Sequence, residues 1–296
     1  MNHNIKEYSI SLICILIAFL VSIAAAQNGA LYNNYPISII CMALSFIIHW
    51  LVFIPSFFYK TEKFYDITGT VAYMSILITT AYLLSIIKNE VVLLRSILSI
   101  IFVMIWAIRL GAFLFTRVIK VGEDKRFEDA KKSFSKFLMF FNISALWVFL
   151  TIVNVLTMII NNSDSITDIF FIIGFSIAII GLIIEVVADR QKRKFRMNIS
   201  NKGEFIKSGL WSISRHPNYF GEILIWLGIS FSTLPILSGW QFITLISPIF
   251  VILLLTKVSG INLLETVADE KWGLDKNYQD YKEKTSVLIP FLTYKR

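Results

Sequence analysis

The sequence lacks charged residues where a water-soluble protein would need them. Only 16% of its 296 residues are charged and 56% are hydrophobic, whereas a soluble domain carries roughly 25% charged residues. No Asp, Glu, Lys or Arg occurs between Tyr8 and Tyr59, and such a run is long enough to cross a bilayer twice at about 20 residues per span. The sequence therefore predicts a protein that crosses a membrane several times.

Cysteines and glycine-rich motifs are also scarce, which excludes two kinds of site. Cys14 and Cys41 both lie in apolar runs, so the chain offers neither a disulfide framework nor a CxxC metal site. No GxGxxG motif occurs, so a soluble type of dinucleotide-binding fold does not hold a cofactor here. Membrane topology accounts for most of the net charge of +8, so we expect no nucleic-acid partner, and no protein partner is indicated.

The apolar segments predict an all-α transmembrane bundle of about eight spans. They lie at residues 10–26, 36–58, 67–87, 92–117, 138–160, 168–188, 219–236 and 240–258. The uncharged connection Gln27–Pro36 is dense in turn-forming residues and suits a short hairpin on the translocated side. The first run could instead be a cleaved signal peptide, but it is longer than the usual apolar region of one and its start is only weakly basic.

Charge distribution predicts the orientation of the bundle. An even number of spans places both termini on one side, and that side carries 25 of the 28 Lys and Arg residues. The positive-inside rule makes it the cytoplasm, of either a bacterial inner membrane or an endoplasmic reticulum. We expect one membrane domain over residues 1–296, with spans of a substrate side in 1–137 and of a cofactor side in 138–296. The tail Gly260–Arg296 alternates apolar, aromatic and charged residues, as in an amphipathic cytoplasmic segment.

Charged groups at membrane depth are costly and often face a cavity or a partner. Arg109 lies deep in the fourth span, and an ion pair with Glu185 is the structural alternative to a functional role. The alternative for Asp189, Glu222 and Lys257 is that they reach the interface as snorkelling side chains.

One stripe of the third span combines a carboxylate, a hydroxyl and a phenol. Asp66, Thr70 and Tyr73 are spaced i, i+4 and i+7, so a helix directs all three toward one cavity. A phenol near a carboxylate is a plausible proton donor, and His49 in the second span is a further candidate. The structural alternative is that Asp66 caps the helix and Tyr73 only packs against its neighbours.

The richest motif follows the sixth span. Its loop carries eight basic residues and leads to Trp211 and the segment Ser214–Glu222, which reads SRHPNYFGE. This segment resembles the R-H-x-N-Y-x-G-[DE] signature of sterol reductases, steroid 5-alpha-reductases and the bacterial DUF1295 family. The tail, with Glu265, K-W-G at 271–273, Tyr278, Tyr281 and I-P at 289–290, resembles the ending of the same group.

The resemblance implies a helical membrane reductase that binds NADPH from the cytoplasmic side and an apolar, steroid-like substrate among its N-terminal spans. The residues that it implies for cofactor binding are Asp189, Arg196, Trp211, Arg215, His216, Asn218, Tyr219, Glu222, Glu265, Tyr278 and Tyr281. It does not place the substrate-side groups, so Tyr73, Asp66 and His49 are catalytic candidates by position alone.

Two other classes stay open. Isoprenylcysteine and phospholipid methyltransferases share an R-H-P-x-Y-x-G motif and bind S-adenosylmethionine. The basic loop favours NADPH, whose phosphates form strong bonds to cations, although topology also demands many of these cations. A non-catalytic lipid-binding protein or a transporter is the third class, but the paired half-repeats of many transporters do not occur in this sequence.

Overall fold

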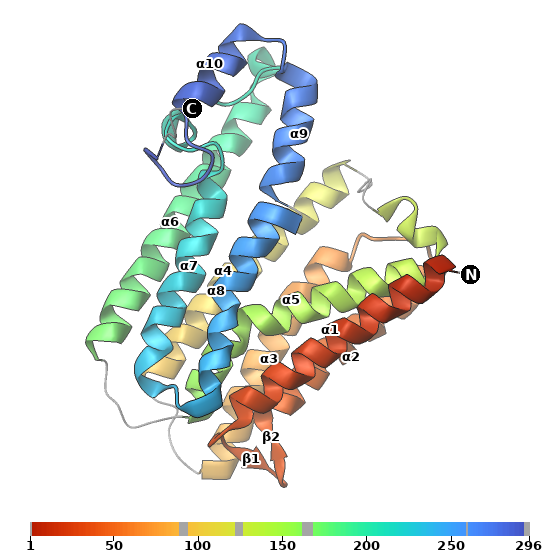
Figure 1. Ribbon diagram of the computed structural model, residues 1–296, viewed down its shortest axis with the longest axis vertical. Helices are drawn as coiled ribbons and strands as arrows, with labels where there is room; N and C mark the ends of the chain where they lie inside the picture. Colours follow the sequence, from red (N-terminus) through yellow and green to blue (C-terminus); the bar gives the residue numbers. More distant parts are fainter. Residues whose placement is uncertain (1, 89–93, 122–126, 162–167, 259, 293–296) are drawn as a thin grey trace. The chain divides into compact units, whose positions relative to one another are not determined.

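The structure is a computed structural model that describes residues 2–88, 94–121, 127–161, 168–258 and 260–292. In these ranges the helices are joined by loops, and the two strands of the structure form one short hairpin (Figure 1). It forms two compact units. Unit 1 comprises Met1–Asp168 and Thr233–Ser247, and unit 2 comprises Ile169–Ser232 and Pro248–Arg296.

Unit 1 contains five long helices and the hairpin. Its elements are α1 (Asn2–Ala26), β1 (Leu31–Tyr32), β2 (Tyr35–Pro36), α2 (Ile37–Phe58), α3 (Tyr65–Lys88), α4 (Leu94–Val121), η2 (Ala130–Lys132), α5 (Phe134–Asn161), η5 (Leu234–Ile236) and η6 (Gly239–Leu245).

Unit 2 is built from two long helices, a broken third one and a short C-terminal helix. Its elements are α6 (Ile169–Met197), η3 (Ile199–Asn201), η4 (Gly209–Ser212), α7 (Pro217–Thr233), α8 (Ile246–Leu253), the π-helical turn η7 (Leu254–Val258), α9 (Ile261–Trp272) and α10 (Lys276–Lys284). Thr233 of α7 and the first two residues of α8 belong to unit 1.

Eight helices of the described chain are long and apolar enough to cross a membrane. Each overlaps one of the eight predicted spans, which confirms the all-α transmembrane fold. The chain is therefore an integral, multi-pass membrane protein. The assignment of residues 1–137 to a substrate side and 138–296 to a cofactor side stays a prediction.

Helix α6 is longer than the apolar segment that predicted it. The predicted span ends at residue 188, but the helix continues to Met197. Residues 189–197 contain no glycine or proline and are rich in Lys, Arg and Gln, which are good helix formers. The apolar residues therefore predict the length of the membrane span but not the length of the helix. The basic segment that follows is helical because its residues have high helix propensity.

The predicted hairpin between the first two spans is present. Leu31 pairs with Pro36 and Tyr32 with Tyr35 in an antiparallel ladder. The two turn residues, Asn33 and Asn34, have φ values of 47° and 67°. Asparagine tolerates this left-handed region better than most residues do, which suits a two-residue turn.

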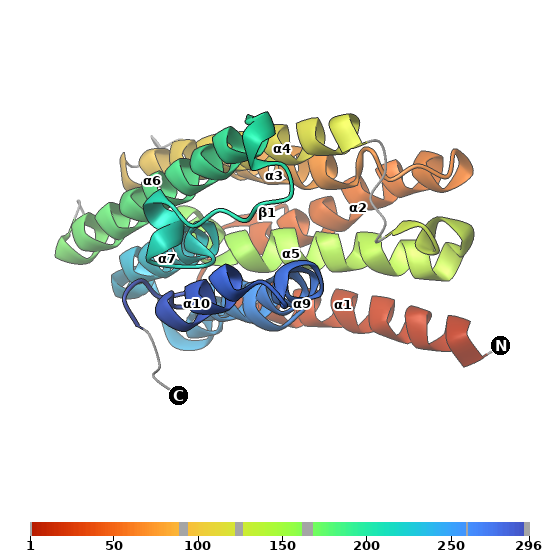
Figure 2. The ribbon, with the colours of Figure 1, turned by 90° about the horizontal axis from the view of Figure 1, so that it is seen from above.

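Helix α5 forms the core of unit 1. Every residue from Val148 to Ile160 is buried, and α5 packs against α1, α2 and α3. Figure 2 shows α5 between α1 on one side and α2 and α3 on the other. Because its neighbours cover it on several sides, α5 is apolar around its whole circumference, as a buried helix must be.

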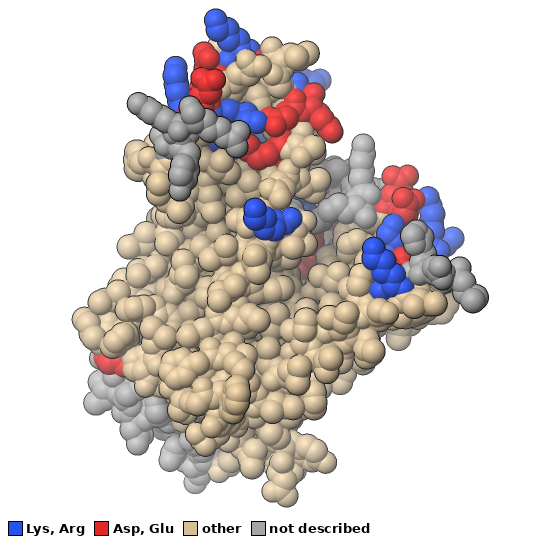
Figure 3. Space-filling model, viewed as in Figure 1, with Lys and Arg blue, Asp and Glu red and all other residues tan. Residues whose placement is uncertain are grey.

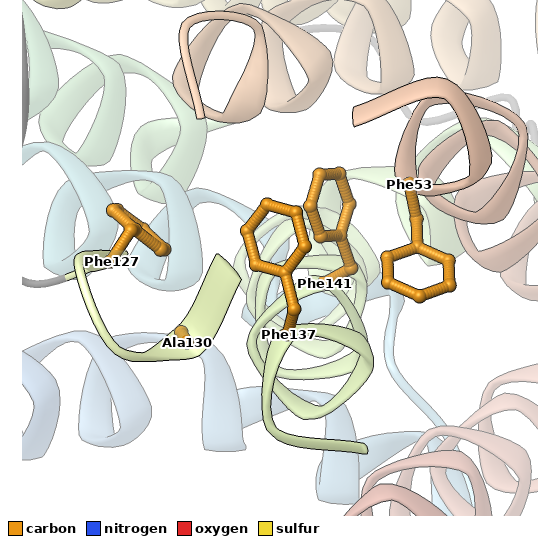
Figure 4. Packing of buried hydrophobic residues seen from close by; sticks show 5 residues of the cluster. All are labelled: Phe53, Phe127, Ala130, Phe137 and Phe141. Atoms are coloured by element: carbon orange, nitrogen blue, oxygen red, sulfur yellow. The ribbon is translucent and has the colours of Figure 1, made fainter. Parts of the chain in front are cut away.

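An aromatic cluster fills one end of this core. Phe53 of α2 meets Phe137 and Phe141 of α5 at ring-centroid distances of 5.9 and 5.5 Å. Phe127 joins them from the segment before η2, at 6.2 Å from Phe137. Figure 4 shows these rings together with Ala130. The edge-to-face pairs, Phe53–Phe141 and Phe127–Phe137, each add about 0.5–1.5 kcal/mol beyond the burial of apolar area.

Polar contacts within unit 1 join segments that the sequence places on the same side of the membrane. On the predicted cytoplasmic side, Lys131 pairs with the buried Glu62 at 2.7 Å. On the opposite side, Arg95 pairs with Asp168 at 2.6 Å. The contacts agree with the predicted alternation of the spans.

Helices α6 and α7 of unit 2 pack through glycines. A Cβ atom on Gly174 would lie 2.4 Å from the carbonyl oxygen of Gly228, and one on Gly181 would lie 2.6 Å from that of Gly221. The glycines are spaced seven residues apart on both helices, so they lie along one face of each. Small residues let helix backbones approach closely in a membrane, where packing drives association.

Charged side chains gather at one end of each unit. In unit 2 they surround α9 and α10, while the surface of the apolar helices carries few of them (Figure 3). This separation is expected of helices that expose their apolar sides to lipid and their ends to water.

Candidate functional site

A pocket in unit 1 lies between α3, α4 and α5. It contains about 350 Å³ of empty space, part of it open to the outside. Asp66, Thr70 and Tyr73 all line it, as their helical spacing predicts. Trp106 of α4 and Trp147 of α5 add two indole rings to the wall. The pocket is therefore mainly aromatic and apolar, with a few polar groups, as many small-molecule sites are.

Tyr73 is held between the two indoles. The residue is 2% exposed, and its ring meets those of Trp106 and Trp147 edge-on at centroid distances of 5.4 and 6.4 Å. The expectation that Tyr73 packs against its neighbours is thus correct, and the same residue also lines the pocket. Its catalytic role stays a prediction.

Asp66 lies in the first turn of α3, one residue after the helix begins. Its Oδ2 is 3.7 Å from Nη2 of Arg117, which is 44% exposed. Thr70 donates its hydroxyl hydrogen to the carbonyl oxygen of Ala107 at 3.2 Å. Gly111 permits this close approach of α3 and α4, because a Cβ atom there would lie 1.9 Å from Thr70 Oγ1.

His49 is fully buried in α2. Its Nδ1 is 2.7 Å from the carbonyl oxygen of Ser45 and its Nε2 is 3.0 Å from Ser144 Oγ. Ser144 lines the pocket, so His49 is connected to it through one side chain. Its predicted role as a catalytic residue is not tested by these contacts.

The second candidate site is a charged cluster in unit 2 around Glu265. One carboxylate oxygen accepts from Nε2 of His216 at 2.8 Å, and the other is 3.0 Å from Nη2 of Arg215. Lys282 Nζ lies 4.0 Å from Glu265 and 2.6 Å from Asp269 Oδ1. Two carboxylates of α9 thus lie close to Arg215, which precedes α7, and to Lys282 of α10.

Local structure explains why these groups meet. Arg215 and His216 directly precede α7, whose first residue is a proline that suits a helix start. The C-terminal tail pairs with this segment: Arg215 N–H donates to Ser286 O at 2.9 Å, and Ser214 Oγ donates to Leu288 O at 2.7 Å. The tail therefore covers the signature.

An aromatic cluster adjoins the charges. The ring of Phe205 lies 5.1 Å from that of Tyr278, 5.4 Å from that of Tyr281 and 5.8 Å from that of Trp272. Tyr281 donates its hydroxyl hydrogen to Trp211 O at 2.6 Å. Burial raises the pKa of both tyrosines above the ordinary value, so each keeps its proton at neutral pH.

Trp211 is buried and already has partners. Its indole N–H donates to Ala188 O at 3.1 Å, and Lys192 Nζ lies 4.4 Å from the ring centroid. This cation–π contact joins the basic end of α6 to the loop.

The electrostatics of His216 follow from its surroundings. Burial lowers the pKa of His216, and the hydrogen bond and negative charge of Glu265 oppose this shift. The charges of Lys192 and Arg215 lower it further. His216 is therefore a neutral imidazole at pH 7, with the hydrogen of Nε2 directed at the carboxylate.

The other predicted cofactor residues lie on the helices that enter and leave this loop. Asp189 and Arg196 are on α6, spaced i and i+7, so they share a face. Asn218 and Tyr219 form the first turn of α7, and the Tyr219 ring stacks on His216 at 5.8 Å and 16°. Glu222 follows one turn later and is 7% exposed. The cofactor role of all these residues stays a prediction.

Sequence reasoning did not select Lys282, Ser144, Trp106 or Trp147. For Lys282 a signal exists, because Glu265 and Asp269 are four residues apart on one helix face and require a cation. The three pocket residues lie in apolar runs, and only their positions in space mark them.

The sequence matches one protein family and has several distant relatives. Residues 52–285 match the profile of the family described as "Protein of unknown function (DUF1295)". The chain is 26% identical over 129 residues to 3-oxo-5-alpha-steroid 4-dehydrogenase 1 of Mus musculus, covering 44% of this chain and 45% of that protein. It is 27% identical over 124 residues to steroid 5-alpha-reductase DET2 of Arabidopsis thaliana, covering 41% and 42%.

A third relative is a probable 7-dehydrocholesterol reductase of Acanthamoeba polyphaga mimivirus, 34% identical over 83 residues that cover 23% of this chain and 19% of that protein. The chain thus spans less than half the length of each of these curated relatives. No solved structure matches. The eight apolar helices define a multi-pass membrane protein, and the sequence has distant similarity to steroid and sterol reductases. The chain belongs to the DUF1295 family.

Proposed function

We propose that this protein is a membrane-embedded, NAD(P)H-dependent reductase of a lipid-soluble substrate such as a conjugated ketone. The observation that carries the proposal is the cluster in unit 2, where the signature residues Arg215 and His216 meet Glu265 under the C-terminal tail. Distant similarity to proteins named as steroid and sterol reductases supports it.

The donors of unit 2 fit a phosphorylated cofactor. Nε of Arg215 is buried and has no hydrogen-bond acceptor within the described part of the chain. A phosphate oxygen would satisfy it, because guanidinium groups bind phosphates through charge-assisted hydrogen bonds. Arg193 and Lys194 are exposed at the end of α6, where Arg196 also lies. These residues would hold the diphosphate and the 2′-phosphate of NADPH.

The pocket of unit 1 suits the apolar substrate. Its indole walls would exclude water, and the Tyr73 phenol would donate a hydrogen bond to the carbonyl oxygen, where negative charge develops during reduction. Asp66 provides a second polar group for orienting the substrate. When bound, NAD(P)H supplies the hydride that the reduction requires.

Ligand stabilisation distinguishes the reductase from a methyltransferase. Thermal unfolding of purified protein is measured with NADPH and, separately, with S-adenosylmethionine. A ligand at 100 times its dissociation constant adds about 2.7 kcal/mol to the stability of the folded state. We expect NADPH to raise the midpoint of thermal unfolding and S-adenosylmethionine to leave it unchanged. The reverse pattern would make the protein a lipid or prenylcysteine methyltransferase, and no response to either would favour a non-catalytic lipid-binding protein.

Two variants distinguish a specific contribution of Arg215 to NADPH binding from the general effect of removing a positive charge. Arg215→Ala removes the buried guanidinium and is expected to weaken NADPH binding by roughly 10- to 100-fold, the usual loss for a hydrogen bond to a charged group. Lys284→Ala removes an exposed cation of α10 and is the matched control, expected to bind NADPH like the wild type. Equal binding by the wild type and both variants would contradict the assignment of Arg215.

A further inference from the structure

The contacts around the pocket of unit 1 determine which of its polar groups donate hydrogen bonds and which accept them. His49 Nδ1 faces the carbonyl oxygen of Ser45 at 2.7 Å. A carbonyl oxygen can only accept, so Nδ1 carries a hydrogen. A charged imidazole would be costly inside an apolar helix bundle, and we therefore assign the neutral ring, in which Nε2 is an acceptor.

This tautomer sets the role of Ser144. Its Oγ lies 3.0 Å from His49 Nε2, and with Nε2 as an acceptor the serine hydroxyl must be the donor. Ser144 thus gives its only hydrogen to His49 and retains lone pairs on its oxygen. Since Ser144 lines the pocket, it offers a hydrogen-bond acceptor there.

The hydroxyl of Thr70, also in the pocket wall, likewise donates its hydrogen to another protein group. Thr70 Oγ1 donates to Ala107 O at 3.2 Å, and that carbonyl oxygen too can only accept. The side chain of Asp66, whose Oδ2 lies 3.7 Å from Nη2 of Arg117, offers further acceptor oxygens. The polar side chains on this part of the wall are therefore acceptors, while hydrogen-bond donors come from the aromatic residues. Trp147 is one of them, with an indole N–H that is buried and has no acceptor among the described residues.

We propose that the pocket selects lipid-soluble ketones that also carry a hydroxyl group, whose hydrogen bonds to Ser144, and that His49 is a positioning residue that keeps Ser144 an acceptor. This rests on the proposed function for the ketone, but the hydroxyl preference belongs to binding alone. An acceptor buried in an apolar wall favours a ligand that donates to it, because a ligand without a donor leaves it unsatisfied.

The test measures equilibrium binding to purified protein without any nucleotide. The probes are three matched steroid enones that carry, at one ring position, a hydroxyl, a hydrogen or a ketone. We expect the wild type to bind the hydroxyl probe roughly tenfold more tightly than either of the others, the loss typical of one unsatisfied buried group. Equal affinities, or no saturable binding of any probe, would overturn the proposal.

Three variants trace the preference to its cause. In Ser144→Ala the three affinities should become equal within about twofold. In His49→Leu the Ser144 hydroxyl loses its acceptor, so it can donate to the ketone probe. The difference in affinity between the hydroxyl and ketone probes should therefore decrease. An unchanged difference would contradict the positioning role of His49. Ser45→Ala is the matched control, because it removes a hydroxyl bonded to Ala145 O but keeps the backbone carbonyl that fixes the imidazole. It should retain the full preference.

The test of the hydroxyl preference and the test of the reductase function can give different results. A hydroxyl preference without NADPH-dependent reduction would support the pocket and count against the reductase. Reduction of all three probes with equal affinities would support the reductase and overturn the hydroxyl preference.

Discussion

At the scale of single residues, the charges of unit 2 are balanced around one carboxylate. Glu265 lies between a neutral histidine and a guanidinium, while Lys282 is shared between it and Asp269. Sequence reasoning could select Arg215, His216 and Glu265 because they lie in or near a recognisable motif. It could not pair them, since 49 residues separate His216 from Glu265 and only folding brings α9 to the start of α7.

The depressed pKa of His216 predicts a pH dependence of stability. Burial lowers its pKa in the folded state, so the unfolded chain binds a proton more readily, at a pKa of about 6.5. The contribution of His216 to stability is therefore fully present above about pH 6.5 and is lost as the pH falls below it. The thermal midpoint of the wild type should decrease between pH 7.5 and 5.5, measured in detergent.

Other groups titrate over the same range, so the comparison is made with His216→Gln. This variant keeps a donor toward Glu265 but cannot be protonated, and its midpoint should fall less over the same interval. Glu265, Arg215 and Lys192 are the charged neighbours that act on His216, and they remain in place. Parallel curves for wild type and variant would show that His216 does not titrate as described.

At the scale of elements, the close approach of α6 and α7 depends on glycines. A Cβ atom on Gly174 would meet backbone atoms of Gly228 and Ser232 at 2.4 and 2.6 Å, and backbone cannot move aside as a side chain can. We expect Gly174→Ala to lower the thermal midpoint, with a loss of about 1–3 kcal/mol typical of overpacking. Thermal unfolding in detergent measures it.

Gly69→Ala of α3 is the matched control for this prediction. A Cβ atom there would meet only a methyl group of Val148 at 3.6 Å, an ordinary van der Waals contact, and alanine favours helix more than glycine by up to about 1 kcal/mol. Its midpoint should equal or exceed that of the wild type. If Gly174→Ala were equally well tolerated, α6 and α7 would not be packed as closely as the structure shows.

Sequence patterns predicted the elements better than their ends or their packing. Runs of apolar residues identified all eight spans because the bilayer demands about 20 of them in each. The same signal missed the last nine residues of α6, where charged residues continue the helix beyond the apolar run. The glycine face of α6 and α7 was also missed, since glycines seven residues apart mark an interface only once the partner helix is known.

At the scale of the whole molecule, the alternation of charged loops predicts which segments face each side of the membrane. The hairpin of β1 and β2 should be external, and α9 and α10 should be cytoplasmic. Tyr35→Cys and Leu274→Cys test this, since Tyr35 is 67% exposed and Leu274 fully exposed. In intact cells a membrane-impermeant thiol reagent should label the first variant and not the second.

The native cysteines provide the background for this labelling. Cys14 is 5% exposed and Cys41 is fully buried, so the wild type should show little reaction. Both variants should be labelled once the membrane is made permeable, which controls for expression. Labelling of Leu274→Cys in intact cells would reverse the predicted orientation and place the basic end of α6 outside, away from a cytoplasmic nucleotide.

Reduction of a lipid-soluble ketone with NAD(P)H is measured directly as the consumption of NADPH by purified protein on addition of a steroid enone. We expect steady, enone-dependent oxidation of NADPH, with a rate that decreases about 100-fold or more in Tyr73→Phe, because general acid catalysis typically contributes that much. The folded state of the variant is verified by its thermal midpoint. Oxidation of NADPH that does not depend on the enone would contradict the reductase function, and oxidation that Tyr73→Phe leaves unchanged would contradict the role of Tyr73 as proton donor.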